Sequence, residues 1–306
     1  MNVGDLFYSN DDGVETLHKR IKLSDIILAK GISKKDELIE FLRNELSETF
    51  DCTVKFWLQG SYKSKTLIKP VSSSSSYDID IGVYLFFDAE SEGVDSVDVK
   101  DALKNALKSY CQINNEATLQ DSKNACEGLI YSAFLTIDTP VYYKTDNSIK
   151  LATDSGWIDS DPRAIQRWLT DVHTDLNYRA LMKRLVRYFK AWVNVKWKDT
   201  TYKKIPSLAL NVIIANKMVV CEREDESFIY TALAICDELE EMLIIGSPLD
   251  GKNLLTMPED SESFVHQKLD DLKAICSQCI NANEYERGIK LSNLFEHYFP
   301  QLNIEE

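Results

Sequence analysis

The sequence predicts an α+β fold, in which a mixed sheet with flanking helices packs against a mostly helical second domain. Up to about residue 155, segments with the period of a strand alternate with segments of helical period. After that point nearly every apolar segment has helical period, beginning at 165–195. We therefore expect two domains, residues 1–155 and 156–306, each of them long enough to bury a core.

Each expected element rests on periodicity and on the residues at its ends. In the first domain, a helix at 33–50 has Ser33 as a suitable N-cap, and Pro140 places the strand that contains it at an edge or a bulge. The other expected elements of this domain are strands at 53–58, 77–87 and 134–143, a helix at 98–110 and a serine-rich loop at 71–76. In the second domain we expect helices at 165–195, 206–221, 228–243 and 264–280.

The composition is that of a globular protein, with 44% hydrophobic and 27% charged residues. No apolar run reaches the length of a membrane helix, and the first residues lack the pattern of a signal peptide. The seven cysteines form no disulfide framework, which favours a reducing compartment, so we expect a cytoplasmic location. Cys276 and Cys279 share a predicted helix face, which explains their spacing better than half a zinc site does.

The net charge of −14 opposes binding to a phosphate backbone unless basic residues are concentrated in one place. The segment 181–204 does concentrate them, with eight lysines and arginines against one aspartate. Its length suits a local anion site better than a long nucleic-acid track. We therefore expect activity that requires neither DNA nor RNA.

The segment YDIDIGVYLFF at 77–87 places two aspartates on one side of a strand. Alternate residues of a strand face the same side, so Asp78 and Asp80 lie on one face, about 6.6 Å apart along the backbone. The other face is apolar from Tyr77 to Phe87. Like charges on one face repel, and a divalent cation would turn this repulsion into attraction. The structural alternative is an exposed edge strand made soluble by its charges.

A glycine-serine turn, Gly60-Ser61, precedes this strand. Glycine adopts backbone conformations closed to other residues, and a helix beginning at Ser61 would present free N–H groups to an anion. Lys63 and Lys65 add positive charge nearby. A phosphate cradle beside a carboxylate pair is what metal-assisted nucleotidyl transfer requires. Neither GxxxxGK(S/T) nor GxGxxG occurs, which excludes the P-loop and Rossmann classes.

A GS followed by DxD resembles the active-site signature of the DNA polymerase β-type nucleotidyltransferases. The blocks DIDIGVYL, FLTIDTPVYY, SGWIDSDPRAIQRWL and LFEHYFP, in this order, are similar to the bacterial cGAS/DncV-like nucleotidyltransferases, which are cyclic-oligonucleotide synthases (CD-NTases). The similarity extends from about Asp25 to Pro300. It implies a polymerase β-like nucleotidyltransferase core, with the helical domain completing the nucleotide pocket.

The resemblance also assigns a third carboxylate. Members of the family use an aspartate on a neighbouring strand, and the matching residue is Asp138. The resemblance implies that Asp78, Asp80 and Asp138 are catalytic and hold two Mg²⁺ ions, for which Mn²⁺ can substitute. From the residues alone, Asp138 before Thr139-Pro140 is equally well explained as a turn former.

For the triphosphate of the substrate, the resemblance implies contacts from Gln59, Gly60, Ser61, Lys63, Lys190 and Ser207. Lys190 belongs to the basic segment and Ser207 begins the helix that follows it. Each of these two has a structural alternative: Lys190 on a solvated charged helix face, and Ser207 as a helix cap beside Pro206.

The leading hypothesis is an enzyme that condenses nucleoside triphosphates such as ATP and GTP into a cyclic di- or trinucleotide second messenger, with release of pyrophosphate, in anti-phage (CBASS-type) defence. A linear or protein-modifying nucleotidyltransferase on the same fold is the first alternative, and an inactive nucleotide-binding scaffold is the second. The presence of all three aspartates argues against the scaffold. Expected partners are the NTP substrates and proteins of the same defence operon that regulate the enzyme or attach to its C-terminal tail, with no membrane association.

Overall fold

The computed structural model describes residues 2–70, 76–87, 94–132, 134–145 and 148–302. The chain forms two compact units, and both are discontinuous in sequence. The unit that contains the sheet, here called the sheet unit, comprises Leu23–Lys65 and Ser72–Gln166. The helical unit comprises Met1–Lys22, Thr66–Val71 and Arg167–Glu306.

The sheet unit combines a mixed sheet with flanking helices, which confirms the predicted fold class. Its strands are β1 (Thr53–Gln59), β2 (Tyr77–Phe86), β3 (Ala117–Leu119), β4 (Glu127–Tyr131), β5 (Leu135–Thr139), β6 (Val141–Lys144), β7 (Ile149–Thr153) and β8 (Gly156–Asp159). Its helices are α3 (Asp25–Phe50), α4 (Gly60–Lys63) and α5 (Ser96–Ile113), and α6 (Pro162–Asp171) contains the boundary between the units. The predicted serine loop lies, except for residue 76, outside the described residues.

Helix α3 begins earlier than the sequence predicts. Its N-cap is Ser24, whose side chain accepts a hydrogen bond from the backbone N–H of Ile27, so the prediction of Ser33 as the cap is wrong. The first turn has no apolar stripe facing the core, because the side chains of Ile26 and Ile27 are 84% and 38% exposed. Without that stripe, helical periodicity cannot reveal the first turns of the helix.

Strand β2 lies inside the sheet and organises it. β1 runs antiparallel to it, with Gln59 opposite Asp80. β5 and β6 run parallel to successive parts of β2, and β4 and β7 extend the sheet by antiparallel pairing with β5 and β6. Because β2 has neighbours along its length, the explanation of its aspartates as charges on an exposed edge is wrong.

The single strand expected at 134–143 is divided at Pro140 into β5 and β6. Proline has no N–H to donate to a neighbouring strand. Both pieces nevertheless keep one register with β2, with Leu135 opposite Tyr77 and Val141 opposite Val83. The neighbour on the outer side changes at this point from β4 to β7, so Pro140 interrupts an internal strand and does not mark an edge.

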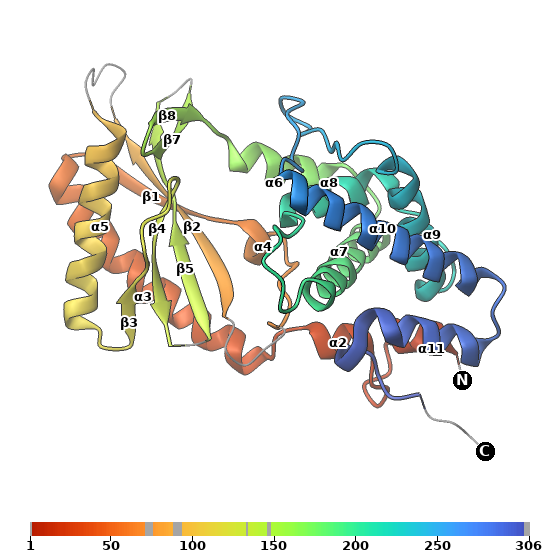
Figure 1. Cartoon of the computed structure of the whole chain (residues 1–306). Helices are drawn as coiled ribbons and strands as arrows, with labels where there is room; N and C mark the ends of the chain where they lie inside the picture. Colours follow the sequence, from red (N-terminus) through yellow and green to blue (C-terminus); the bar gives the residue numbers. More distant parts are fainter. Residues whose placement is uncertain (1, 71–75, 88–93, 133, 146–147, 303–306) are drawn as a thin grey trace. The chain divides into compact units, whose positions relative to one another are not determined.

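The two faces of β2 have different surroundings. α3 and α5 lie against the same face of the sheet (Figure 1). Tyr77 points to this face, because its hydroxyl donates a 2.9 Å hydrogen bond to the Ile27 carbonyl of α3. Ile79 and Ile81 have the same parity and are completely buried. Asp78 and Asp80 therefore face away from the covering helices.

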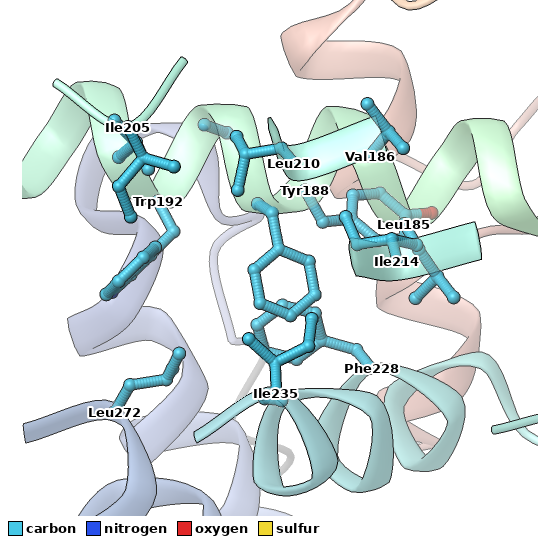
Figure 2. Packing of buried hydrophobic residues seen from close by; sticks show 14 of the residues in the cluster. Leu185, Val186, Tyr188, Trp192, Ile205, Leu210, Ile214, Phe228, Ile235 and Leu272 are labelled. Atoms are coloured by element: carbon cyan, nitrogen blue, oxygen red, sulfur yellow. The ribbon is translucent and has the colours of Figure 1, made fainter. Parts of the chain in front are cut away.

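The helical unit takes elements from both ends of the chain. Its helices are α1 (Val3–Phe7), α2 (Leu17–Ile21), α7 (Leu176–Lys196), α8 (Ser207–Lys217), α9 (Glu224–Glu238), α10 (Glu259–Ile280), α11 (Glu284–Phe295) and the 3₁₀ turn η1 (Glu296–Tyr298). Figure 2 shows part of its core, to which α7, α8, α9 and α10 contribute aliphatic and aromatic side chains, and α1, α2 and α11 belong to the same core.

The first 22 residues belong to this core and not to the sheet unit, which differs from the expected boundary between residues 155 and 156. Phe7 is completely buried, and its ring lies 5.3 Å from Tyr188, 5.6 Å from Phe228 and 5.8 Å from Phe295, measured between ring centroids. Burial of these aromatic rings binds the start of the chain to its second half.

The paired cysteines of α10 are structural. Cys276 and Cys279 are free and completely buried, as expected for two positions on one apolar helix face. Burial raises the pKa of Cys276 well above its ordinary value, which keeps the thiol protonated and unreactive.

No helix in the described part of the chain is both long enough and apolar enough to cross a lipid bilayer.

The core of the helical unit generates a stability prediction. Phe228→Ala removes a completely buried ring that packs on Phe7, Phe189 and Phe295, and we expect a loss of about 3–5 kcal/mol. Tyr230→Ala on the same helix, where the side chain is 40% exposed, is the matched control and should cost less than about 1 kcal/mol. Urea unfolding followed by far-UV circular dichroism measures both, and equal midpoints would contradict this account of the core.

Candidate active site

Strand register brings the three predicted carboxylates onto one patch of the sheet. Asp80 of β2 lies opposite Asp138 of β5, and Asp78 lies opposite Thr136. Paired residues of adjacent strands, about 4.8 Å apart, project to the same face. Asp138 lies inside β5, so its explanation as a turn former is wrong. The structure thus groups Asp78, Asp80 and Asp138, whose catalytic roles stay a prediction.

Neighbouring side chains supply hydrogen-bond donors to this patch. The hydroxyl of Thr136 donates to the Asp78 carboxylate. The amide of Gln120 donates to Oδ1 of Asp138 at 3.3 Å and also to the Leu129 carbonyl at 3.0 Å. Asp78 and Asp138 therefore each accept a hydrogen bond from a neighbouring side chain on this face of the sheet.

Lys123 is the basic residue of the patch. Its Nζ lies 2.8 Å from Oδ1 and 2.7 Å from Oδ2 of Asp138. Partial burial lowers the pKa of Lys123, but the hydrogen bond and the charge of Asp138, with a smaller contribution from Asp78, outweigh it and leave that pKa above its ordinary value. The ammonium is therefore fully charged at neutral pH.

The donor set of this patch suits a hard divalent ion, because Mg²⁺ prefers carboxylate oxygens. In the part of the chain that the structure describes, no three His, Cys, Asp or Glu side chains converge closely enough to form a complete metal cage. Asp138 instead turns both oxygens to the ammonium of Lys123, a cation already held at this place. The residues therefore fit a divalent ion, provided that Asp138 turns from Lys123 towards it.

The predicted glycine-serine turn lies against the carboxylates. Gly60 has φ +58°, and a Cβ atom there would lie 1.9 Å from Oδ2 of Asp80. Only glycine satisfies both the backbone conformation and this close approach. The helix that follows, α4, is a single turn that includes Ser61 and ends at the exposed Lys63. Phosphate binding by Gly60, Ser61 and Lys63 stays a prediction.

Gln59, predicted to contact nucleotide, already has protein partners. Its Nε2 donates to the Tyr84 hydroxyl at 3.1 Å, and the Tyr142 hydroxyl donates to its Oε1 at 3.1 Å. The two tyrosine rings stack with centroids 4.6 Å apart. Burial raises the pKa of Tyr84 to about 12, so this phenol remains protonated. Gln59 thus joins β1, β2 and β6 beside the carboxylate patch, and a contact with nucleotide stays a prediction.

Lys190 and Ser207 belong to the helical unit. Lys190 is only 8% exposed, and its Nζ donates to the carbonyl and hydroxyl oxygens of Thr66 at 3.1 and 3.4 Å, so a solvated helix face is the wrong explanation for it. Ser207 is the first residue of α8, whose N-cap is Pro206, so it is not the cap. Triphosphate binding by either residue stays a prediction.

Sequence reasoning missed Thr136, Gln120 and Lys123 as parts of the site. Thr136 could have been predicted, because it is two residues before Asp138 in the same strand and therefore faces the same side. Gln120 and Lys123 lie after the three-residue strand β3, which is too short to show a pattern. Their place beside Asp138 comes from the pairing of β4 with β5.

The turn at Gly60 generates a second prediction. Gly60→Ala combines positive φ with a clash against Asp80, whereas Gly251→Ala has φ +73° and meets no atom within 4 Å. The control should therefore lose only about 1–2 kcal/mol from backbone strain. We expect Gly60→Ala to lose clearly more, as measured by urea unfolding of both variants. If Gly60→Ala were as stable as Gly251→Ala, the close approach of Gly60 to Asp80 would not be what requires glycine at this position.

Comparisons with known proteins identify the family of this chain. The family model "Cyclic GMP-AMP synthase DncV-like, nucleotidyltransferase domain" matches residues 54–142, which include the turn and all three carboxylates. A cyclic GMP-AMP synthase of Escherichia albertii is 66% identical over 305 residues, which cover 100% of this chain and 69% of that protein.

Solved structures show the same fold. DncV of Vibrio cholerae in its 3′-deoxy GTP-bound form has a TM-score of 0.81 and 19% sequence identity, covering 98% of this chain and 96% of that one. V. cholerae DncV in complex with the linear intermediate 5′-pppA(3′,5′)pG has a TM-score of 0.69 and 22% identity, covering 94% and 79%. Together with the E. albertii relative, which matches this chain over its whole length, these findings confirm the resemblance seen in the sequence: the chain belongs to the DncV-like nucleotidyltransferases.

Proposed function

We propose that this nucleotidyltransferase condenses two nucleoside triphosphates into a cyclic dinucleotide and releases pyrophosphate. The observation that carries the proposal is the grouping of Asp78, Asp80 and Asp138 on one face of paired strands. It is supported by the 66% identity with a protein named cyclic GMP-AMP synthase, which makes ATP and GTP the first substrates to test.

The carboxylates are proposed to hold two divalent ions, Mg²⁺ or Mn²⁺. When bound, such ions polarise the α-phosphate and neutralise the charge of the leaving pyrophosphate. Asp78 and Asp80 would share them. Asp138 would complete the site and favour loss of the proton from the attacking ribose hydroxyl.

The triphosphate would be held by the turn at Gly60 and Ser61, with Lys63 supplying positive charge. Lys190 and Ser207 are further proposed contacts, which come from the family resemblance. For Lys190 to bind phosphate, its ammonium would have to exchange the oxygens of Thr66 for phosphate oxygens.

Ring closure needs the same chemistry twice. The first transfer leaves a linear dinucleotide that keeps its own triphosphate, and a second in-line attack within this molecule closes the ring with a large advantage of proximity. The linear intermediate bound to the structurally similar V. cholerae DncV supports such a sequence of steps.

The wider role that we propose is production of a second messenger in anti-phage defence, without a nucleic-acid activator. The net charge of −14 supports the proposal that no nucleic acid activates the enzyme, because an acidic surface repels a phosphate backbone. The neighbouring genes test the proposed role in anti-phage defence. An adjacent gene for an effector nuclease or a membrane protein would support this role, and genes of primary metabolism would count against it.

The carboxylate pair generates a third prediction. Asp78→Asn and Asp80→Asn each remove a charge from the site with little change of volume, so nucleotide transfer should fall about 100-fold or more while the melting temperature of the metal-free protein is kept. Asp159→Asn, an exposed residue of β8, is the matched control and should retain activity. Pyrophosphate release measures transfer, and full turnover by either site variant would refute the assignment.

A fourth prediction concerns the product. Purified protein given Mg²⁺ or Mn²⁺ and α-labelled ATP and GTP, without nucleic acid, should form a product that resists phosphatase, because a ring has no terminal phosphate. Omitting one NTP at a time identifies the bases that enter the ring. Products that are all phosphatase-sensitive would indicate a linear transferase, label on a polypeptide would indicate protein modification, and NTP binding without product would indicate a scaffold.

A further inference from the structure

The ammonium of Lys123 forms an ion pair with Asp138, the third carboxylate of the candidate site. Its Nζ contacts both oxygens of Asp138, at 2.8 and 2.7 Å, in a two-pronged ion pair. The Asp138 side chain is 19% exposed, whereas that of Lys123 is 51% exposed. The acid is therefore held by the sheet, while the base approaches it from the solvent side.

The backbone that carries Lys123 is firmly anchored. Lys100 of α5 is 4% exposed, and its Nζ donates to the carbonyls of Lys123 and Asn124 at 2.9 and 3.0 Å. The backbone N–H of Asp154 donates to the Asn124 carbonyl at 3.2 Å, and Lys123 forms a β-bridge with Cys126. The Lys100 ammonium also pairs with the carboxylates of Asp154 and Glu127. This buried, fully partnered charge holds the backbone at Lys123 and Asn124 in place, so any movement of the Lys123 ammonium comes from the Lys123 side chain.

The contact has a direct consequence for a divalent ion at this patch. An ammonium and a metal ion compete for the same lone pairs of the Asp138 carboxylate. The lysine side chain is flexible, and the Lys123 side chain is half exposed. Moving its ammonium from Asp138 into water therefore costs little free energy when a divalent ion binds the carboxylate. Until then it offsets the repulsion between Asp138 and the neighbouring carboxylates.

We propose that Lys123 is a positioning residue of the site: its ammonium holds Asp138 in the metal-free enzyme, and binding of the divalent ion displaces it. This inference rests on the metal site proposed above. It assigns to Lys123 a defined effect on metal affinity, which acts mainly through Asp138.

Mn²⁺ binding in the absence of any NTP tests the proposal, with free Mn²⁺ measured by electron paramagnetic resonance. Lys123→Met removes the competing cation and should bind Mn²⁺ about tenfold more tightly than wild type, in the range of one charge-assisted hydrogen bond. Lys104→Met is the matched control. It removes the same charge from the same unit, but Lys104 donates at 2.7 Å to the hydroxyl of Ser122 and not to a carboxylate, so its affinity should stay within about twofold of wild type.

A double-mutant cycle identifies the route of the effect. In an Asp138→Asn background the Lys123 ammonium has lost its charged partner, so adding Lys123→Met should change Mn²⁺ affinity by less than about twofold. Unchanged or weaker Mn²⁺ binding by Lys123→Met would overturn the proposal. So would a tenfold gain that persists with Asn at position 138, because Lys123 would then act by general charge and not through Asp138.

The same titrations separate this inference from the metal site on which it rests. If the wild type binds Mn²⁺ and Lys123→Met binds it equally, only the role of Lys123 falls. If neither protein binds Mn²⁺, the metal site and the role of Lys123 both fall. Binding detected only after Lys123→Met supports both.

Discussion

The parallel pairing of β2 with β5 is the interaction on which the candidate site depends. It sets Asp78 opposite Thr136 and Asp80 opposite Asp138. The residues of the first pair are 58 positions apart in the chain, and the second pair follows in the same register. A slip of one residue would turn these side chains to the helix-covered face. Burial of Ile79 against its register partner Ile137, both completely inaccessible, opposes such a slip. The carboxylate side chains on one face of the sheet are therefore positioned by hydrophobic contacts on the opposite face.

Grouping three carboxylates has an electrostatic cost that the sheet itself cannot offset. The structure distributes donors around the group: the hydroxyl of Thr136 on Asp78, and the amide of Gln120 and ammonium of Lys123 on Asp138. These donors place partial or full positive charge beside the carboxylates, which offsets part of the repulsion between them. The electrostatic cost is thus confined to a few side chains on one face, while the helix-covered face of β2 has a completely buried apolar interior.

The helical unit shows a different kind of long-range dependence. Phe7 packs into the same core as Phe228 and Phe295, so residues from the two ends of the chain are buried together. Local pattern cannot reveal this, because α1 and α2 have five residues each and are shorter than two helical turns. Their assignment to the helical unit is a property of the folded core.

By itself, the sequence determined the alternation that builds β2, the common face of Asp78 and Asp80, the helical character of the second half and membership of the family. These features are local, or are carried by short motifs, so a single segment contains the whole signal. Only the tertiary structure decided that α3 begins at Asp25, that Pro140 divides one strand into two, and that Lys123 lies on Asp138. Each of these depends on what a segment packs against, and burial and strand pairing across the chain are set by the whole fold.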